Sequence, residues 1–143
     1  MRDSLELDRE KAKKLSNSRI EEAKVLLREN SFSGAYYLAG YSIELALKAV
    51  ICKTFKSETI PDKNFVNSLH SHKLVDLMNL SGLKIQFEND KRDNPELENF
   101  WTIVTKWNEN SRYEIKGRQD ASSIIEAIIN QQNGILTWIK QHW

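Results

Sequence analysis

The sequence predicts an all-α fold, an up-and-down bundle of about five helices built by one domain over residues 1–143. Two prolines and five glycines are few breakers for 143 residues. Apolar residues recur at helical spacing, and evenly alternating runs typical of half-buried strands are absent from the sequence. A chain of this length can bury a core of its own.

The first predicted helix ends near Asn30. Residues 1–14 are rich in charge, and we expect them to be frayed or only loosely helical. Ser18-x-x-Glu21 fits a capping box, in which each side chain satisfies a free backbone N–H. The residues that then recur at helical spacing are Ile20, Ala23, Leu26 and Leu27. NSFSG ends this helix.

The most apolar stretch, GAYYLAGYSIELALKAVIC at 34–52, predicts the central helix of the bundle, which we expect to extend over 34–55. Its only charges are Glu44 and Lys48. On a helical wheel, one narrow seam carries only small side chains: Ala35, Ala39, Ser42, Ala46 and Ala49. The seam would let one neighbouring helix approach closely. Nearly opposite lies a polar stripe made of Tyr37, Tyr41, Glu44 and Lys48.

Three further helices are expected after a connection at 53–64 that contains several lysines. HKLVDLMNL predicts a short helix, capped by Ser71 and ended near Gly82. IQFENDKRDN is interpreted as a solvated loop. Asn94-Pro95 is a typical helix start. NENSRYEIKGRQ is interpreted as a polar loop long enough to suggest function, and Asp120 can cap one last helix. Trp101, Trp107 and Trp138 are expected to be buried.

Composition excludes several classes of protein. The formal net charge of +1 is unlike a broadly basic nucleic-acid surface. The single cysteine, Cys52, excludes an internal disulfide and suits a cytoplasmic protein. The amino-terminal residues show no apolar signal core, and no apolar run approaches the ~20 residues of a membrane span. The sequence contains no phosphate loop, dinucleotide fingerprint, zinc-protease motif or nucleophile elbow. No cofactor is therefore expected.

Several segments together resemble the HEPN domain family. They are AYYLAGYSIELALKAVI, the preceding EAKVLLREN, the short helix opened by His72, and Trp107-Asn-Glu-Asn-Ser-Arg-Tyr113. The resemblance spans roughly residues 18–140. It implies a helical bundle that commonly dimerises. It also implies prokaryotic roles in toxin–antitoxin pairs with small nucleotidyltransferases, in phage defence or in RNA cleavage.

The sequence departs from the catalytic pattern that this resemblance implies. Catalytic members carry an arginine, four to six residues, and then a histidine. None of His70, His72 and His142 has an arginine at that distance upstream. The tyrosine modified by partner transferases in some members sits beside the same motif, so its counterpart is missing too. No catalytic residue is therefore assigned.

Two groups of candidate site residues remain. Arg112, Tyr113, Lys116 and Arg118 interleave cations with an aromatic ring, which suits a phosphate and a stacked base; the alternative is a solvated loop in which Arg112 ties down a helix end. The polar stripe and His72 form the second group. Glu44 and Lys48 can be a solvent-facing ion pair, or can line a groove between two subunits, where Glu44 would hold Arg112.

The histidines do not predict a metal site. His70 and His72 alone supply too few zinc ligands. We instead expect His72 to hydrogen-bond a neighbouring element.

Three functions follow as hypotheses. The first is a non-catalytic homodimeric binding module for a nucleotide, an RNA or a nucleotidyltransferase partner. The second is a ribonuclease with a non-standard base, for which His72 is the candidate. The third is a homodimer that binds only another protein. The missing arginine–histidine motif favours the first over the second, and no membrane partner is expected.

Overall fold

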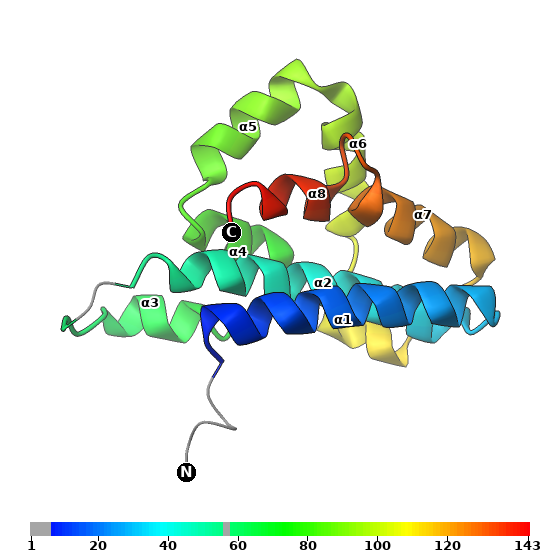
Figure 1. The fold of residues 1–143 in the computed structure, drawn as a ribbon, viewed down its shortest axis with the longest axis horizontal. Coiled ribbons are helices and arrows are strands. Elements are labelled where there is room, and N and C mark those ends of the chain that lie inside the picture. The colour runs from blue at the N-terminus through cyan, green and yellow to red at the C-terminus, as the bar shows by residue number, and fades with distance from the viewer. Residues whose placement is uncertain (1–6, 56–57) are drawn as a thin grey trace, which may run out of the picture.

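The computed structural model describes residues 7–55 and 58–143. These residues form eight α-helices and one 3-10 helix, with no β-strand among them, which confirms the all-α class. Figure 1 shows their arrangement. The helices are α1 (Arg9–Arg28), α2 (Phe32–Cys52), α3 (Lys63–Ser68), α4 (Leu74–Leu80), α5 (Lys84–Asp93), α6 (Pro95–Val104), η2 (Glu109–Tyr113), α7 (Arg118–Ile129) and α8 (Ile135–Lys140).

A long hairpin of α1 and α2 is the base of the fold (Figure 1). Helix α1 begins at Arg9, where the Asp8 side chain accepts a hydrogen bond from the Lys11 N–H at 2.7 Å. The expected start at Ser18 and the expected fraying over residues 9–14 are therefore wrong, because a stronger cap lies further upstream. The rest of the segment expected to fray, residues 1–6, lies outside the described residues.

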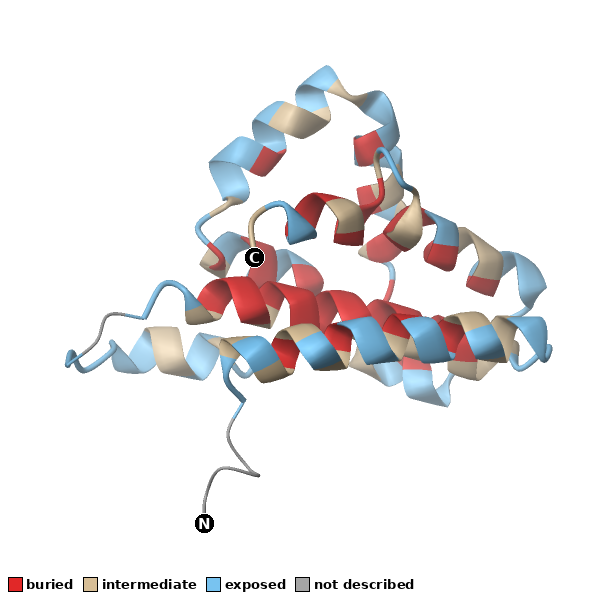
Figure 2. Ribbon diagram, in the orientation of Figure 1, coloured by how far each residue is buried: buried red, intermediate tan, exposed pale blue. Residues whose placement is uncertain are grey.

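Helix α2 is central, as the sequence predicts, although it ends at Cys52 rather than at residue 55. It contacts α1, α4, η2, α7 and α8. The seam of small residues is fully buried. The Ser16 hydroxyl on α1 donates to the Ser42 carbonyl across 2.7 Å, so α1 approaches α2 closely. Figure 2 shows that burial is concentrated along α2.

By length and composition alone, α2 could cross a membrane, contrary to the expectation that no apolar run is long enough. However, 72% of its most apolar window is buried inside the fold. A core helix of a bundle has this pattern, since other helices cover its apolar surface.

Of the residues expected to form a loop at 85–94, all but Asn94 belong to α5. Only Phe87 of this helix is buried, so the sequence carries almost no apolar periodicity to reveal it. The Phe87 ring packs 5.0 Å from the ring of Trp101 and 4.7 Å from that of Trp138. This ring anchors the helix together with the Asp90 carboxylate, which accepts from the Trp138 Nε1 at 2.8 Å.

The carboxyl-terminal part contains two helices where one was expected. The Asn130 side chain accepts hydrogen bonds from the backbone N–H groups of Gln132 and Asn133 and so stabilises the turn between α7 and α8. The N-cap residue of α7 is Gly117 and not Asp120. Asp120 lies in the first turn of the helix, where its side chain accepts a hydrogen bond from the Gly117 N–H at 3.2 Å. The Asn94 cap of α6 is confirmed.

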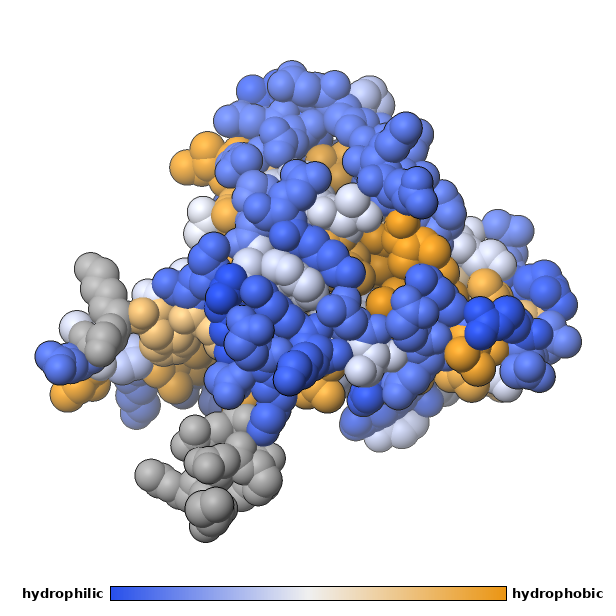
Figure 3. All heavy atoms as spheres, in the orientation of Figure 1, coloured by the Kyte–Doolittle hydropathy of each residue, from blue (hydrophilic) through white to orange (hydrophobic). Residues whose placement is uncertain are grey.

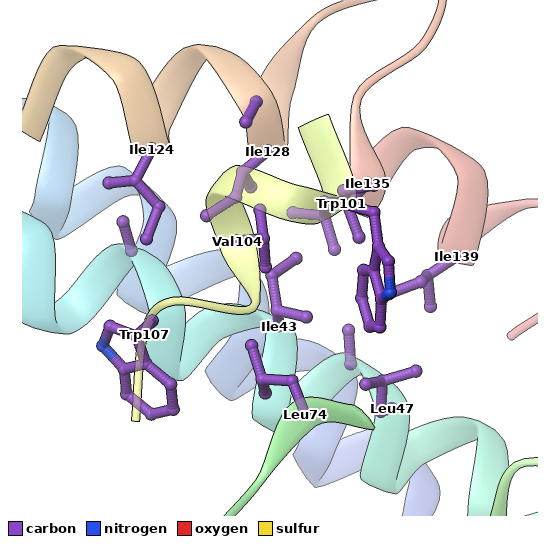
Figure 4. Close-up of a cluster of buried hydrophobic side chains, with 14 of the residues drawn as sticks. Ile43, Leu47, Leu74, Trp101, Val104, Trp107, Ile124, Ile128, Ile135 and Ile139 are labelled. Atoms are coloured by element: carbon purple, nitrogen blue, oxygen red, sulfur yellow. The ribbon is translucent and has the colours of Figure 1, made fainter. Parts of the chain in front are cut away.

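The core lies where α7 and α8 cover α2 and α6. Figure 4 shows isoleucines of α7 and α8 directed towards Ile43 and Leu47 of α2, with Trp101 and Val104 of α6 between them. Trp101, Trp107 and Trp138 are all buried, as predicted. This core fixes the position of α2 and hence of its polar stripe.

Candidate functional site

The polar stripe of α2 is not solvent-facing at its centre. Glu44 is only 1% exposed, whereas Tyr37, Tyr41 and Lys48 are half-buried. A buried carboxylate is costly unless it is paired and hydrogen-bonded. Glu44 therefore needs partners inside the fold.

Glu44 pairs with His72 and Lys48. The Nδ1 of His72 lies 3.1 Å from each carboxylate oxygen of Glu44, and the Nζ of Lys48 lies 3.2 Å from Oε2. The Nε2 of His72 lies 3.3 Å from Oε2 of Glu109 in η2. One imidazole thus joins α2 to η2. Both of its nitrogens can donate to these carboxylates at once only when the ring is protonated.

The backbone on either side of His72 is fixed. The Ser71 hydroxyl accepts from the Lys73 N–H at 3.1 Å and donates to Asp76 across 3.2 Å, although the cap position of α4 is Lys73 rather than the expected Ser71. Leu74, two residues after His72, is buried in the core. The prediction that His72 hydrogen-bonds a neighbouring element is confirmed.

Trp107 attaches the start of η2 to α2. Its Nε1 donates to the Tyr37 carbonyl at 3.1 Å, and its ring lies against Gly40. A Cβ at Gly40 would be 2.2 Å from that ring, so only glycine allows this approach. Figure 4 shows Trp107 next to α2.

Side-chain hydrogen bonds hold η2 itself. The Asn108 side chain accepts from the Asn110 N–H at 2.8 Å, and the Ser111 hydroxyl accepts from the Asn108 N–H at 3.2 Å. Ser111 is buried. The predicted polar loop is therefore an ordered 3-10 turn in its first half.

Within the chain, Arg112 does not contact Glu44, so the predicted contact could form only between two subunits. Its guanidinium lies 4.8 Å from the centre of the Tyr113 ring, which is 75% exposed. Within residues 7–55 and 58–143, no carboxylate oxygen lies within 4.0 Å of this guanidinium. A hydrogen bond with the Tyr113 side chain, more than any carboxylate, holds the pKa of Arg112 above its ordinary value.

Lys116 and Arg118 lie elsewhere, at the amino-terminal end of α2. The Nζ of Lys116 is 4.8 Å from the Tyr36 ring centre and 3.4 Å from Glu114. Arg118 stacks over Phe32 at 4.8 Å and donates to the Asn30 side chain at 2.9 Å. Along the α2 axis, these contacts are about 12–18 Å from Glu44. Lys116 and Arg118 thus each lie over an aromatic ring of α2, whereas Arg112 lies over Tyr113.

Tyr41 belongs to the surroundings of Glu44. Burial, then the Glu44 carboxylate and then Tyr37 raise the pKa of the Tyr41 hydroxyl above its ordinary value of 10.0. The Tyr37 ring lies 6.0 Å from the Tyr41 ring and 5.9 Å from the Trp107 ring. The stripe is therefore a pair of tyrosines beside a paired carboxylate.

No metal centre is visible in the part of the chain that the structure describes, because no three His, Cys, Asp or Glu side chains converge there. His72 faces Glu44, whereas His70 lines a groove near the end of α2. The two histidines therefore do not act as one ligand pair.

Sequence reasoning missed three residues of this site. Gly40 left a visible signal, because a glycine inside an otherwise strong helix suggests a close approach. Glu109 and Ser111 lie in the segment interpreted as a polar loop, and neither left a signal of its own.

Comparison with known families gives one result. The family model described as HEPN domain matches residues 9–142, nearly the whole chain. Comparisons with curated proteins and with solved structures found no match.

Proposed function

This chain belongs to the HEPN domain family, and on that premise we propose that it is a non-catalytic binding module for a nucleotide or an RNA, with Arg112 and Tyr113 as its contact residues. The observation that carries the proposal is the exposed Arg112–Tyr113 pair, whose guanidinium has no carboxylate within 4.0 Å among the described residues.

The chemistry of this pair fits a phosphate next to a base. A guanidinium presents a planar set of N–H donors that matches two phosphate oxygens. No ion pair within the described ranges competes for Arg112, whose side-chain partner is Tyr113. The exposed tyrosine ring offers a face on which a base can stack. Both side chains project from the same short turn, so one nucleotide can contact both.

The role of the buried network is to orient that turn. Glu44 holds His72, and His72 reaches Glu109, three residues before Arg112. Trp107, two residues before Glu109, packs against Gly40 and holds the same end of the turn. In this proposal Glu44 is a positioning residue that acts on Arg112 through η2 and not by direct contact.

Lys116 and Arg118 have a different role from the one expected. Each stacks on an aromatic ring of α2 and bonds locally. The Lys116 N–H also donates to the Ser33 hydroxyl at 2.9 Å. We assign them to anchoring the segment that follows η2.

The test compares Arg112→Ala with Lys106→Ala. Lys106 is an exposed cation six residues away, so its replacement removes the same charge from the same region. Fluorescence anisotropy with a short single-stranded RNA should show binding weakened about tenfold by Arg112→Ala, or about 1.4 kcal/mol. Lys106→Ala should change it less than about twofold. If both variants lost the same affinity for RNA, the effect would come from the positive charge of the region and not from a specific contact of Arg112.

A His72-dependent ribonuclease is the second candidate. The observation in its favour is that a buried carboxylate, Glu44, orients an imidazole whose side chain is 41% exposed. Such a histidine can transfer protons. Under the leading proposal, purified protein leaves single-stranded RNA intact. Cleavage that is lost in His72→Ala but retained in His70→Ala would establish the enzyme instead.

A further inference from the structure

An apolar groove lies at the other end of α2 from the Arg118 contacts, between the last turn of α2 and α3. Its volume is about 440 Å³, within the range of small-molecule sites. Its lining residues are Leu7, Lys48, Ile51, Cys52, Phe55, Val66, Leu69 and His70.

The groove exists because α3 covers α2 incompletely. Helix α3 contributes no fully buried residue, and its Val66 and the adjoining Leu69 remain half-buried. Leu7 and Phe55 at its margin are each 41% exposed. Figure 3 shows apolar atoms at the surface around α3, at the left; further apolar atoms lie right of centre on the same face. Apolar surface of this kind gains free energy when a ligand removes it from water.

Among the described residues, Lys48 is the charged side chain that lines the groove. Asp8 and Arg9, which carry opposite charges, act on Cys52 without belonging to the lining. The ionisable side chains of the groove are Lys48, His70 and Cys52, and no carboxylate of the described residues lines it. Lys48 donates to Glu44 with one of its three N–H groups, while Glu44 also accepts from His72. The ammonium can therefore bind a second anionic partner on its groove side.

We propose that this groove binds a free, small amphiphile, meaning an apolar chain or ring with a single carboxylate held by Lys48. The five apolar side chains provide the body of the site and the ammonium provides its selectivity. This site is separate from the Arg112–Tyr113 pair and does not depend on the function proposed for it.

Cys52 makes binding measurable. Its thiol lines the groove and is the single cysteine of the chain. Burial raises the pKa of this thiol above its ordinary value of 9.0, so alkylation is slow and sensitive to occupancy. The probe is octanoate at about 1 mM, compared with 1-octanol, which has the same chain length without the charge.

Octanoate should slow the alkylation of Cys52 by iodoacetamide about tenfold, and octanol should slow it by less than about twofold. Lys48→Met should abolish this preference for octanoate over octanol. Val66→Trp should fill the groove and remove the octanoate effect. Ile85→Trp, at an exposed apolar position on α5, should behave as the parent protein. Circular dichroism should show that each variant is folded.

Equal protection by octanol and octanoate, or no protection by either, would overturn the proposal. So would a change in the sedimenting mass caused by Val66→Trp, because the groove would then be a contact between copies of the chain. Arg112→Ala should leave the octanoate effect unchanged, which separates this test from that of RNA binding.

Discussion

The Nδ1 of His72 lies 3.1 Å from both carboxylate oxygens of Glu44, across 28 residues of sequence. This contact explains why an otherwise apolar helix retains an acid. Glu44 is buried, yet it is paired on one side with His72 and on the other with Lys48. The polar stripe is thus the place where α2 binds the segments before α4 and in η2.

Glu44→Gln is expected to lower the free energy of unfolding by about 1–3 kcal/mol. The amide keeps the shape of the side chain, but charge-assisted hydrogen bonds become neutral ones. Glu109→Gln removes the outer, half-exposed carboxylate and should cost less than about 1 kcal/mol. Urea unfolding of both variants checks this. If Glu109→Gln costs as much as Glu44→Gln, the buried pair is not the main contact.

Gly40→Ala should destabilise the fold by about 2 kcal/mol or more, at the upper end of the cost of overpacking. The new methyl group would meet the Trp107 ring at 2.2 Å, and that ring is itself buried. Gly117→Ala is the matched control, because nothing lies within 4 Å of its added Cβ. The thermal midpoint and tryptophan emission should change in Gly40→Ala alone. Equal midpoints would show that Trp107 does not pack there.

These two contacts also show what sequence can and cannot predict in this chain. Two local patterns of α2 correctly predicted its central position: apolar residues cover most of its circumference, and small residues form a seam along it. The pairing of Glu44 with His72 joins positions far apart in sequence, so no spacing rule reveals it. From the pattern alone, Glu44 and Lys48 look like an ordinary surface pair.

Helix α5 and η2 were missed for a different reason. A helix with one buried residue has no apolar periodicity, and Phe87 is the one buried residue of α5. The turn of η2 depends on side-chain hydrogen bonds of Asn108 and Ser111, which are equally common in irregular loops. Which aromatic ring each of Arg112, Lys116 and Arg118 stacks on depends on that turn, and so could not be predicted from the sequence.

Stability should fall as the solution becomes alkaline. Burial, as the first cause, raises the pKa of Cys52 above 9.0 and the pKa of Tyr36 and Tyr41 above 10.0. The folded state therefore holds these protons more tightly than the unfolded state. Their contribution is complete below the unfolded values and is lost as pH rises through the raised ones.

Urea unfolding between about pH 8 and pH 11 measures this loss. Tyr41→Phe should reduce the slope of the free energy of unfolding against pH, because a phenylalanine side chain has no hydroxyl proton to lose. Stability that rises with pH over this window would contradict the assignment.

Dimerisation is expected from the family resemblance. Sedimentation at micromolar concentration should give about twice the chain mass of 16.7 kDa. A monomer over the whole concentration range would contradict this expectation. The Arg112–Tyr113 proposal would remain, since both residues belong to one chain.

The salt dependence of RNA binding tests the central claim most directly. If Arg112 contacts a phosphate, Arg112→Ala should reduce the slope of the logarithm of the binding constant against the logarithm of salt concentration by about 1. Lys106→Ala should leave that slope unchanged, and Tyr113→Ala should weaken binding by about 1–3 kcal/mol without changing it. An Arg112→Ala variant that binds RNA with the parent slope and affinity would contradict the account.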